Sequence, residues 1–562
     1  MDGSAYLAEI LHASGLCFTE RGSLRDVLKE ADPRRDVILL PWGSETAGIE
    51  AFLQAGGGVI AIRPVETIRA LAGLKFIRED DDMSRLRLVQ PVCHGARGEP
   101  LWTLGTVDVC EANPGPNVVG YLFKPFDLES EKTGIAEHEV GKGRLVVYTY
   151  DPVMCIVRLR QGYAERADFL PAGQDTPRSI HLHKPNPPHD TAWRPTADLH
   201  ATTLCMLTRR LLGRHAPVPS LWHLPGGHPA LVIYSGDEDW GTQEANDEQM
   251  KALESVGGGM SLYVIPDGTS ITRKHIEEYT RRGHAISVHP NLTSERGKSR
   301  ELQLAKAEEQ ILFFQKTFNW PVRTLRNHCT MWPGYVDLPR LYERLGVGMD
   351  ANCMATLYGQ SPDGGPYVNV DSAIPLRFVE ENGKLIDVFQ QATHVNDDVT
   401  CHPTVGYSQK YSTEQFDWFI QRIYDDAVRW FHGPVCVNVH PCNFILFSGI
   451  QSRMSMQRAH ELGLWIWSID RWHDFWRARS SWQMRGIEWN GSQLSFSMGG
   501  SACESLWLTL PVSAQGRTLK TVKLDGASVK FENVQRHGHT IAQAALPPKV
   551  TEIKVVAEYE AS

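Results

Sequence analysis

The sequence predicts a multidomain α/β protein: an α/β domain over residues 1–215, a (β/α) barrel over residues 226–475 and a small antiparallel β-sandwich over residues 485–562. The chain has 562 residues, which is too many for one hydrophobic core. Up to about residue 475, short apolar runs alternate with amphipathic segments, as in parallel strands joined by helices. Beyond residue 485, apolar and polar residues alternate one by one, which is typical of antiparallel strands.

The composition and net charge of the chain limit the kinds of molecule that it is expected to bind. Hydrophobic residues make up 42% of the chain, as in ordinary globular proteins, and the net charge is -9. This mild charge argues against nucleic acid or an anionic membrane as the main partner. The first residues, Met1–Leu11, lack the basic and apolar regions of a signal peptide, so a cytoplasmic location is expected, with a trimmed secreted protein as the alternative. The eleven cysteines include no Cys-x-x-Cys pair and are expected to be reduced thiols.

Strands and helices alternate in the first part of the chain. Asp36–Pro41 and Gly56–Ile62 are predicted buried strands on either side of a helix at Ala47–Gln54, and Gly141–Tyr150 adds a later strand. Such alternation predicts a parallel, flavodoxin-like sheet with helices on both faces.

Residues 36–62 resemble the core of class I glutamine amidotransferase-like domains. Active members of that family carry a nucleophilic cysteine on a sharp turn after a strand. The turn here reads Arg63-Pro64-Val65-Glu66 and has no thiol to attack a carbonyl. The domain is therefore expected to lack glutaminase activity and to serve in assembly, as in a homo-oligomer, or in shaping the mouth of the barrel.

The middle of the chain alternates strands and helices again, which predicts a (β/α) barrel, with fewer than eight strands as an open alternative. The predicted strands are Ala230–Ser235, Met260–Ile265, Ala285–Val288, Arg323–Asn327, Leu385–Phe389 and Val435–Val439, and the predicted helices are Asp247–Ser255, Thr272–Arg282, Arg300–Phe318, Pro339–Leu345 and Thr413–His432.

The tail contains strands of alternating polarity. Gln493–Ser497, Thr518–Leu524 and Val550–Tyr559 follow this pattern. Asp525-Gly526 is a hairpin-turn dipeptide that leads into the strand Ala527–Phe531. These features predict the β-sandwich.

Four strands of the predicted barrel deliver ionisable side chains at their carboxyl ends. Because strand ends converge at one rim of a barrel, these side chains are expected to meet. A carboxylate and one or two imidazoles are standard ligands of zinc or a similar divalent ion, and a second carboxylate can take a proton from water. Strand parity places the members of each pair on one side: Asp237 with Asp239, Ser287 with His289, Arg326 with His328, and Asn438 with His440.

In order and content, these segments resemble polysaccharide deacetylases of the NodB-homology type over residues 226–475. The resemblance implies that Asp237 is the catalytic base and Asp239 a metal ligand. Gly283–His289 fits the first half of the second motif of the family, which makes His289 a metal ligand. The resemblance further implies that Arg326 holds the base and that His440 is the general acid. An imidazole holds its proton at neutral pH if a carboxylate supports it, and Asp397 or Asp398, which follow the predicted strand ending at Phe389, could be that support.

One position departs from the family. The second metal-binding histidine would fall at residue 293, which is Thr293 here. His328 is the nearest replacement by parity; Thr293, Asn291 or water could instead fill the place, or the metal could be absent. The expected cofactor is zinc or another divalent ion on Asp239, His289 and His328. Candidate substrate contacts beside the motifs are Trp240, Asn327 and Trp332.

These observations predict a metal-dependent hydrolase that removes an N-acetyl or related acyl group from a carbohydrate. Two alternatives remain open: a metal-independent hydrolase of a cyclic amide on the same barrel, and a non-catalytic carbohydrate-binding protein. The carboxylate pair Asp237 and Asp239 argues against the second alternative, because a sugar-binding groove has no need of two adjacent anions.

Overall fold

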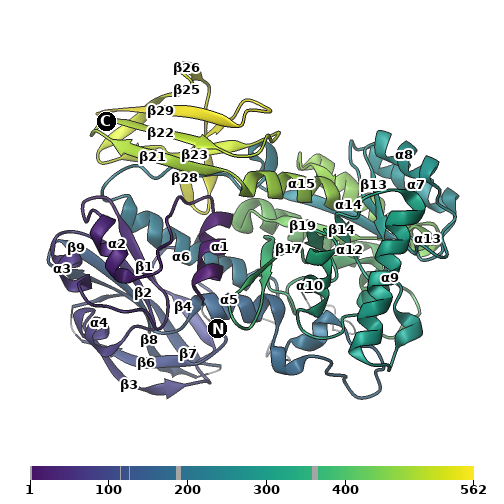
Figure 1. Ribbon diagram of the computed structural model, residues 1–562, viewed down its shortest axis with the longest axis horizontal. Helices are drawn as coiled ribbons and strands as arrows, with labels where there is room; N and C mark the ends of the chain where they lie inside the picture. Colours follow the sequence, from purple (N-terminus) through teal and green to yellow (C-terminus); the bar gives the residue numbers. More distant parts are fainter. Residues whose placement is uncertain (1–2, 114, 126, 185–191, 357–364, 562) are drawn as a thin grey trace. The chain divides into compact units, whose positions relative to one another are not determined.

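The computed structural model describes residues 3–561 except 114, 126, 185–191 and 357–364 (Figure 1). The chain forms two compact units, each made of separate segments. Unit 1 contains Met1–Val157, Thr196–Gly227 and Ala478–Ser562, and unit 2 contains Arg158–Pro195 and His228–Arg477. The predicted domains follow the chain continuously, whereas the observed units do not. Among the described residues, no helix has both the length and the apolar character needed to cross a membrane.

The amino-terminal part of unit 1 is built on a nine-stranded mixed sheet. Strands β1 (Val37–Leu40), β2 (Gly58–Ile62) and β9 (Gly143–Tyr148) are parallel neighbours, and every residue of β2 is buried. These three strands are the ones that the sequence predicts. The helices of unit 1 are α1 (Ser4–Ala13), α2 (Leu24–Glu30), α3 (Ile49–Gln54), α4 (Glu66–Leu71), α5 (Pro152–Gln161), which continues into unit 2, and α6 (Thr196–Leu212).

The other strands of this sheet run antiparallel and depart from the flavodoxin-like expectation. Several of them have no continuous apolar run because much of their length is exposed; β3, for example, is exposed over most of its length. The resemblance to amidotransferase-like domains thus stays a prediction. These antiparallel strands are β3 (Leu74–Asp80), β4 (Arg85–Leu88), β5 (Leu101–Trp102), β6 (Val107–Ala112), β7 (Asn117–Lys124) and β8 (Asp127–Val140).

The carboxyl-terminal part of unit 1 contains two antiparallel sheets. The predicted hairpin is confirmed: Leu524 pairs with Ala527, and Asp525 and Gly526 between them have φ values of 48° and 85°. A four-stranded sheet has the order β10 (Ser220–Leu221), β23 (Trp507–Pro511), β28 (His539–Ala545) and β27 (Glu532–Arg536); the other sheet contains β21 (Gln483–Trp489), β22 (Gln493–Gly499), β24 (Ser513–Ala514), β25 (Arg517–Leu524), β26 (Ala527–Val529) and β29 (Glu552–Ala561).

Unit 2 contains a six-stranded sheet in which all pairings are parallel. Strand β11 lies in its middle and is buried at every residue, as expected for a strand covered on both faces. The strands of this sheet are β11 (Leu231–Asp237), β12 (Ser261–Val264), β13 (Ala285–Val288), β18 (Val395–Asn396), β19 (Pro434–Asn438) and β20 (Ile466–Ser468).

A second sheet of unit 2 has four strands and is joined to the first at both margins. At one margin the Ser287 hydroxyl donates to the carbonyl of Thr324. At the other, the Thr393 N–H donates to Cys353 and the His394 N–H donates to Cys436, so this segment passes from one sheet to the next. The strands are β14 (Thr324–Leu325), β15 (Met349–Asp350), β16 (Leu376–Val379) and β17 (Leu385–Gln390), with only β16 antiparallel.

The helices of unit 2 pack apolar faces onto these sheets. Helix α9 (Arg300–Phe318) has the predicted bounds and buries Ile311, Phe314 and Phe318. The adjacent Phe313 lies on the outer face and is 44% exposed. The remaining helices are α7 (Gln243–Glu254), α8 (Arg273–Arg281), α10 (Asp337–Arg344), α11 (Asp397–Thr400), α12 (Thr413–Asp426), α13 (Pro441–Asn443), α14 (Gly449–Glu461) and α15 (Ile469–Ser480), of which α15 continues into unit 1.

The neighbouring phenylalanines of α9 test this orientation. Phe314→Ala removes a fully buried ring and should lower the free energy of unfolding by about 3–5 kcal/mol. Phe313→Ala, the matched control, should change it by less than about 1 kcal/mol, since its ring already contacts water. Urea denaturation followed by circular dichroism measures both values. Equal losses in the two variants would contradict the assigned face.

Candidate functional site

Each strand that the sequence singled out ends at one cluster of polar side chains in unit 2. Asp237 is the last residue of β11, His289 follows β13, and Arg326 follows β14. Asn438 ends β19, and His440 comes two residues later. All four are parallel strands, so their carboxyl ends lie at the same edge.

Asp237 is held by two neighbours on different strands. Arg326 Nη1 donates to Asp237 Oδ1 at 2.9 Å, and Asn438 Nδ2 donates to Asp237 Oδ2 at 2.9 Å. Arg326 is itself buried and donates further bonds to Asn438 Oδ1 and to Thr393 Oγ1. Burial alone would raise the pKa of Asp237, but the Arg326 guanidinium, with help from His289 and His440, lowers the pKa below its ordinary value. Asp237 is therefore ionised at neutral pH.

Asp239 lies among three imidazoles. His289 Nε2 is 3.2 Å from Asp239 Oδ1, while His440 Nε2 and His328 Nε2 are 3.6 Å and 3.8 Å from Asp239 Oδ2. Asp239 Oδ1 is buried and accepts no hydrogen bond of good geometry. Because a buried carboxylate oxygen without a hydrogen bond is costly, this oxygen fits a site that binds a cation.

Two of these imidazoles point Nε2 toward Asp239 and use Nδ1 elsewhere. His289 Nδ1 lies 2.6 Å from the Arg326 carbonyl, which can only accept, so Nδ1 carries a proton. Burial alone would lower the pKa of His289, but Asp237 and Asp239 raise the pKa above its ordinary value, so a cation at this position would have to displace the proton on Nε2. His328 Nδ1 lies 3.2 Å from Asn291 Oδ1 in the same way. Burial and, to a smaller extent, the nearby His289 lower the pKa of His328 to about 4, which keeps its ring neutral. A neutral imidazole held by its second nitrogen is the usual form of a metal-binding histidine.

The turn that carries Asp239 is strained. Asp239 and Trp240 have φ values of 45° and 59°, a left-handed conformation that non-glycine residues rarely adopt. The Gly241 N–H donates to the Glu238 carbonyl and closes the turn. Glu238 is fully buried and bonds Thr269. Burial raises the pKa of Glu238 to about 7. Such strain persists where surrounding contacts over-determine the backbone, as in binding and catalytic sites.

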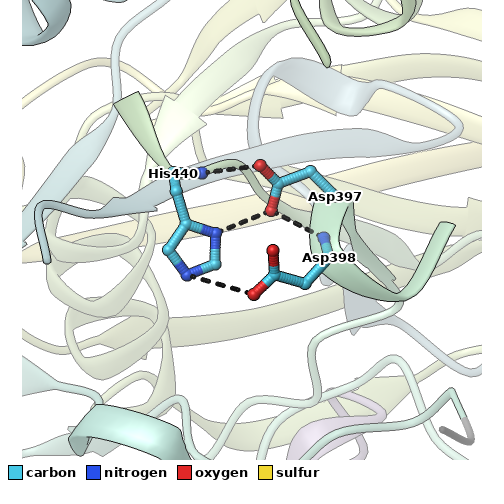
Figure 2. Close-up of side chains that lie close together, drawn as sticks. All are labelled: Asp397, Asp398 and His440. Atoms are coloured by element: carbon cyan, nitrogen blue, oxygen red, sulfur yellow. Dashed lines mark hydrogen bonds and ion pairs between the residues drawn. The ribbon is translucent and has the colours of Figure 1, made fainter. Parts of the chain in front are cut away.

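His440 is held in place by two acidic residues, Asp397 and Asp398 (Figure 2). Its Nδ1 lies 2.7 Å from Asp397 Oδ1, its backbone N–H donates to Asp397 Oδ2, and its Nε2 is 3.9 Å from Asp398 Oδ2. Burial alone would lower the pKa of His440, but Asp397 and then Asp398 raise the pKa well above its ordinary value. His440 is therefore a protonated imidazolium through neutral pH in this arrangement.

The described residues contain one group of three whose ligand atoms all lie within 4.8 Å of one another, and it could hold a metal ion: Asp397, Asp398 and His440. The predicted ligands Asp239, His289 and His328 converge less closely, because the two imidazoles approach different oxygens of Asp239. His440 is thus a member of this group and also lies 3.6 Å from Asp239, one of the predicted ligands. Asp397, however, is already bound to both the ring and the backbone of His440.

The three predicted substrate contacts have different surroundings. Trp240 is 53% exposed and its ring stands edge-on to His328, 5.3 Å between centroids. Trp332 is buried and donates from Nε1 to the Tyr335 carbonyl. Asn327 is also buried, where it donates to Met331 and accepts from Tyr342. The contacts of Trp332 and Asn327 are structural because both side chains are satisfied inside the core, and only Trp240 is available to a ligand.

Sequence reasoning gave no role to two residues of the cluster. Asn438 bonds Asp237, and parity alone could have suggested it, because it shares a strand face with His440. Glu238 lies between the two aspartates, and no pattern in the sequence shows that it is buried. Thr293, which stands where the related family has a histidine, bonds Asn291 rather than the cluster.

Comparisons with known proteins give structural neighbours only. No family model and no curated protein matches the sequence. The chain is similar to the crystal structure of Agd3, described as a novel carbohydrate deacetylase, at 10% identity over 100% of this chain and 98% of that chain, with a TM-score of 0.40. It is also similar to a putative polysaccharide deacetylase from Mycobacterium smegmatis, at 15% identity over 46% and 94% of the two chains, with a TM-score of 0.33.

A third neighbour is a family 4 carbohydrate esterase from Streptomyces lividans in complex with acetate, at 11% identity over 43% of this chain and 92% of that chain, with a TM-score of 0.25. These three neighbours are thus described as carbohydrate deacetylases or esterases. At these identities and scores they carry no argument about the residues of this chain, which rests on the geometry above.

Removal of Arg326 tests the electrostatics of the cluster. In metal-free protein, Arg326→Met leaves the buried Asp237 carboxylate without its guanidinium and should lower the free energy of unfolding by about 3–5 kcal/mol at neutral pH. The wild-type pKa of Asp237 is lowered, so its stabilising contribution is present above the unfolded value of about 3.9 and is lost in acid. The deficit of the variant should therefore shrink as the pH falls.

Urea denaturation from neutral pH to about pH 2, well below the unfolded value of about 3.9, measures this dependence. Arg344→Met is the matched control, because Arg344 pairs with Glu308 at the surface, and it should cost less than about 1 kcal/mol at every pH. A deficit in Arg326→Met that does not vary with pH would show that the guanidinium acts by packing alone.

Proposed function

We propose that this chain is a metal-dependent hydrolase that removes an N-acetyl or related acyl group from a carbohydrate. One observation carries the proposal: Asp237 and Asp239, two residues apart, have opposite surroundings. Asp237 is bonded to Arg326 and Asn438 and ionised, whereas Asp239 faces imidazole nitrogens with an oxygen that accepts no hydrogen bond. Carboxylates held in different environments at one site are the usual sign of separate chemical roles.

The metal is assigned to Asp239 and His289, with His328 as the third ligand. The buried unbonded oxygen of Asp239 and the Nε2 atoms of two imidazoles whose Nδ1 atoms are bonded elsewhere fit such an ion, which would replace the proton on His289 Nε2. A divalent ion there, zinc by its nitrogen and oxygen ligands, would polarise the amide carbonyl and lower the pKa of water. The group Asp397, Asp398 and His440 is the alternative position, in which case His440 is a ligand.

Asp237 is the proposed general base. It is ionised, and Arg326 and Asn438 fix both of its oxygens in position to accept a proton from the attacking water. His440 is the proposed general acid, because its imidazolium is stabilised by Asp397 and its Nε2 lies 3.8 Å from Asp237 Oδ2. The group proposed to take a proton and the group proposed to give one thus lie 3.8 Å apart.

Trp240 supports a carbohydrate substrate. Its ring is more than half exposed beside His328, and an exposed aromatic face next to polar groups suits the C–H face of a sugar ring. Thr293 is the observation that favours the rival reaction, hydrolysis of a cyclic amide without metal, because it removes one expected ligand from the site.

Two variants separate metal binding from base catalysis. His289→Ala should release the ion, whereas Asp237→Asn should retain it and lower turnover on the order of 10²–10⁴-fold, the usual contribution of a general base. Metal content is measured by mass spectrometry of the purified proteins, and turnover by acetate release from a β-1,4-linked N-acetylglucosamine hexamer.

The exposed His460 provides the control, since His460→Ala should change neither quantity. Wild-type protein that turns over a cyclic amide without any divalent ion would establish the metal-free alternative. Full metal retention in His289→Ala, or near-normal turnover in Asp237→Asn, would refute the corresponding role.

The role of His440 predicts a pH dependence. Asp397 raises the pKa of His440, so the imidazolium persists to alkaline pH, and kcat/KM should fall only where His440 loses its proton. Asp397→Asn should move this alkaline limb to lower pH. Asp398→Asn is the matched control and should move it less, because Asp398 lies 3.9 Å from Nε2 and is held by Asn443.

Acetate release over a pH series measures the alkaline limb of kcat/KM in both variants. An alkaline limb that stays in place in Asp397→Asn would exclude His440 as the acid. If His440→Ala strips the metal instead of lowering turnover alone, His440 is a ligand and exchanges roles with His328.

A further inference from the structure

Unit 1 contains a second feature with the character of a binding site, at the carboxyl ends of its parallel strands. Trp42 follows β1 and is 56% exposed, and Arg63 follows β2. The Arg63 guanidinium carbon lies 5.1 Å from the centre of the Trp42 ring. In sheets with parallel strands, this edge is where ligands are commonly bound.

Arg63 has a strained backbone that the surrounding residues hold in place. Its φ is 40°, and its N–H donates to the Tyr148 carbonyl at the end of β9 at 2.8 Å. Left-handed conformations in non-glycine residues concentrate where a side chain must be aimed.

One buried carboxylate fixes the cationic side chains beneath two exposed rings. Asp108 accepts from Arg63 at 2.8 Å and from Arg69 at 3.0 Å. Arg69 in turn lies 4.8 Å from the centre of the Phe76 ring, which is 40% exposed. A lone exposed aromatic residue needs no explanation, but here two rings are each backed by a guanidinium, and both guanidinium groups are anchored on Asp108.

The charges of this cluster are internally balanced. Besides Asp108, Arg63 Nη2 donates to Glu79 at 2.8 Å, and Glu79 is paired with Asp108 across β3 and β6. With its guanidinium groups already engaged by carboxylates, the cluster offers little to a phosphate or another anion. It instead offers flat apolar faces next to hydrogen-bonding groups, which suits a neutral sugar ring.

We infer that Trp42 and Phe76, supported by Arg63, Arg69 and Asp108, form a non-catalytic binding site for neutral saccharides on unit 1. The residues of the Asp237 cluster take no part in this site. The inference therefore does not depend on the proposed hydrolase activity, and either can fail while the other stands.

Titration calorimetry on the full-length protein tests it, with β-1,4-linked hexamers of glucose, N-acetylglucosamine and galacturonic acid as probes. The wild type should bind a neutral hexamer more tightly than the charged one. Trp42→Ala should weaken that binding at least about tenfold, and Phe76→Ala should weaken it too. Trp418→Ala, which removes a tryptophan of similar exposure from unit 2, should leave it unchanged.

Circular dichroism and thermal unfolding of each variant check that the fold is kept, and acetate release from the N-acetylglucosamine monomer checks that turnover is unchanged in Trp42→Ala. No binding of either neutral hexamer, tighter binding of the charged hexamer, or equal binding by Trp42→Ala and wild type would overturn the inference. A change in oligomeric state in Trp42→Ala without loss of saccharide binding would overturn it as well, and would assign the rings to a contact between copies of the chain.

Discussion

The buried ion pair between Asp237 and Arg326 is the interaction on which the organisation of unit 2 depends. Arg326 reaches Asp237 on β11 and Asn438 on β19, and its Nε donates to the Ala351 carbonyl beyond β15. One guanidinium thus ties the ends of strands from both sheets. A buried charge without such partners would be very costly, so these strand ends have little freedom to separate.

The same ion pair compensates part of the negative charge of the acidic cluster around His440. Asp237, Asp239, Asp397 and Asp398 all lie within 4 Å of His440. Arg326 and the imidazoles supply the opposing positive charge, and a divalent cation would supply more. The three aspartates other than Asp237 have no arginine of their own among the described contacts, which is why the environment of Asp239 differs so sharply from that of Asp237.

Much of this site could be predicted because it obeys strand periodicity. Asp237, His289, Arg326 and His440 follow buried apolar runs, and a period of two places their partners on the same face. The positions of Asn327 and Trp332 could not be judged in this way, since whether a residue just past a strand points to solvent or to the core depends on the fold of the following turn. Cys329 and Thr330, with φ values of 57° and 50°, make that turn unlike any regular pattern.

Unit 1 shows the other limit of sequence reasoning. Strands β1, β2 and β9 are continuous apolar runs because both faces are covered, and they were predictable. Strand β8 reads Asp-Leu-Glu-Ser-Glu-Lys at its start, and only its pairing with the adjacent strands β7 and β9 makes it a strand. The segment Arg158–Pro195 belongs to unit 2 because of contacts far along the chain, since Arg160 bonds Ile374 and Gln161 bonds Val379.

The discontinuity of unit 1 has a consequence for biosynthesis. Strand β10 forms its sheet with β23, and the hydroxyls of Ser220 and Thr509, 2.6 Å apart, are separated by 289 residues of chain. At roughly 5–20 residues per second, a ribosome needs on the order of 15–60 s to make that interval. Throughout it, the edge of β10 lacks its partner β23 while the larger segment of unit 2, His228–Arg477, is synthesised. The sheet of β10 can thus be completed only after that segment has been made, and until then the edge of β10 is open to pairing with other chains.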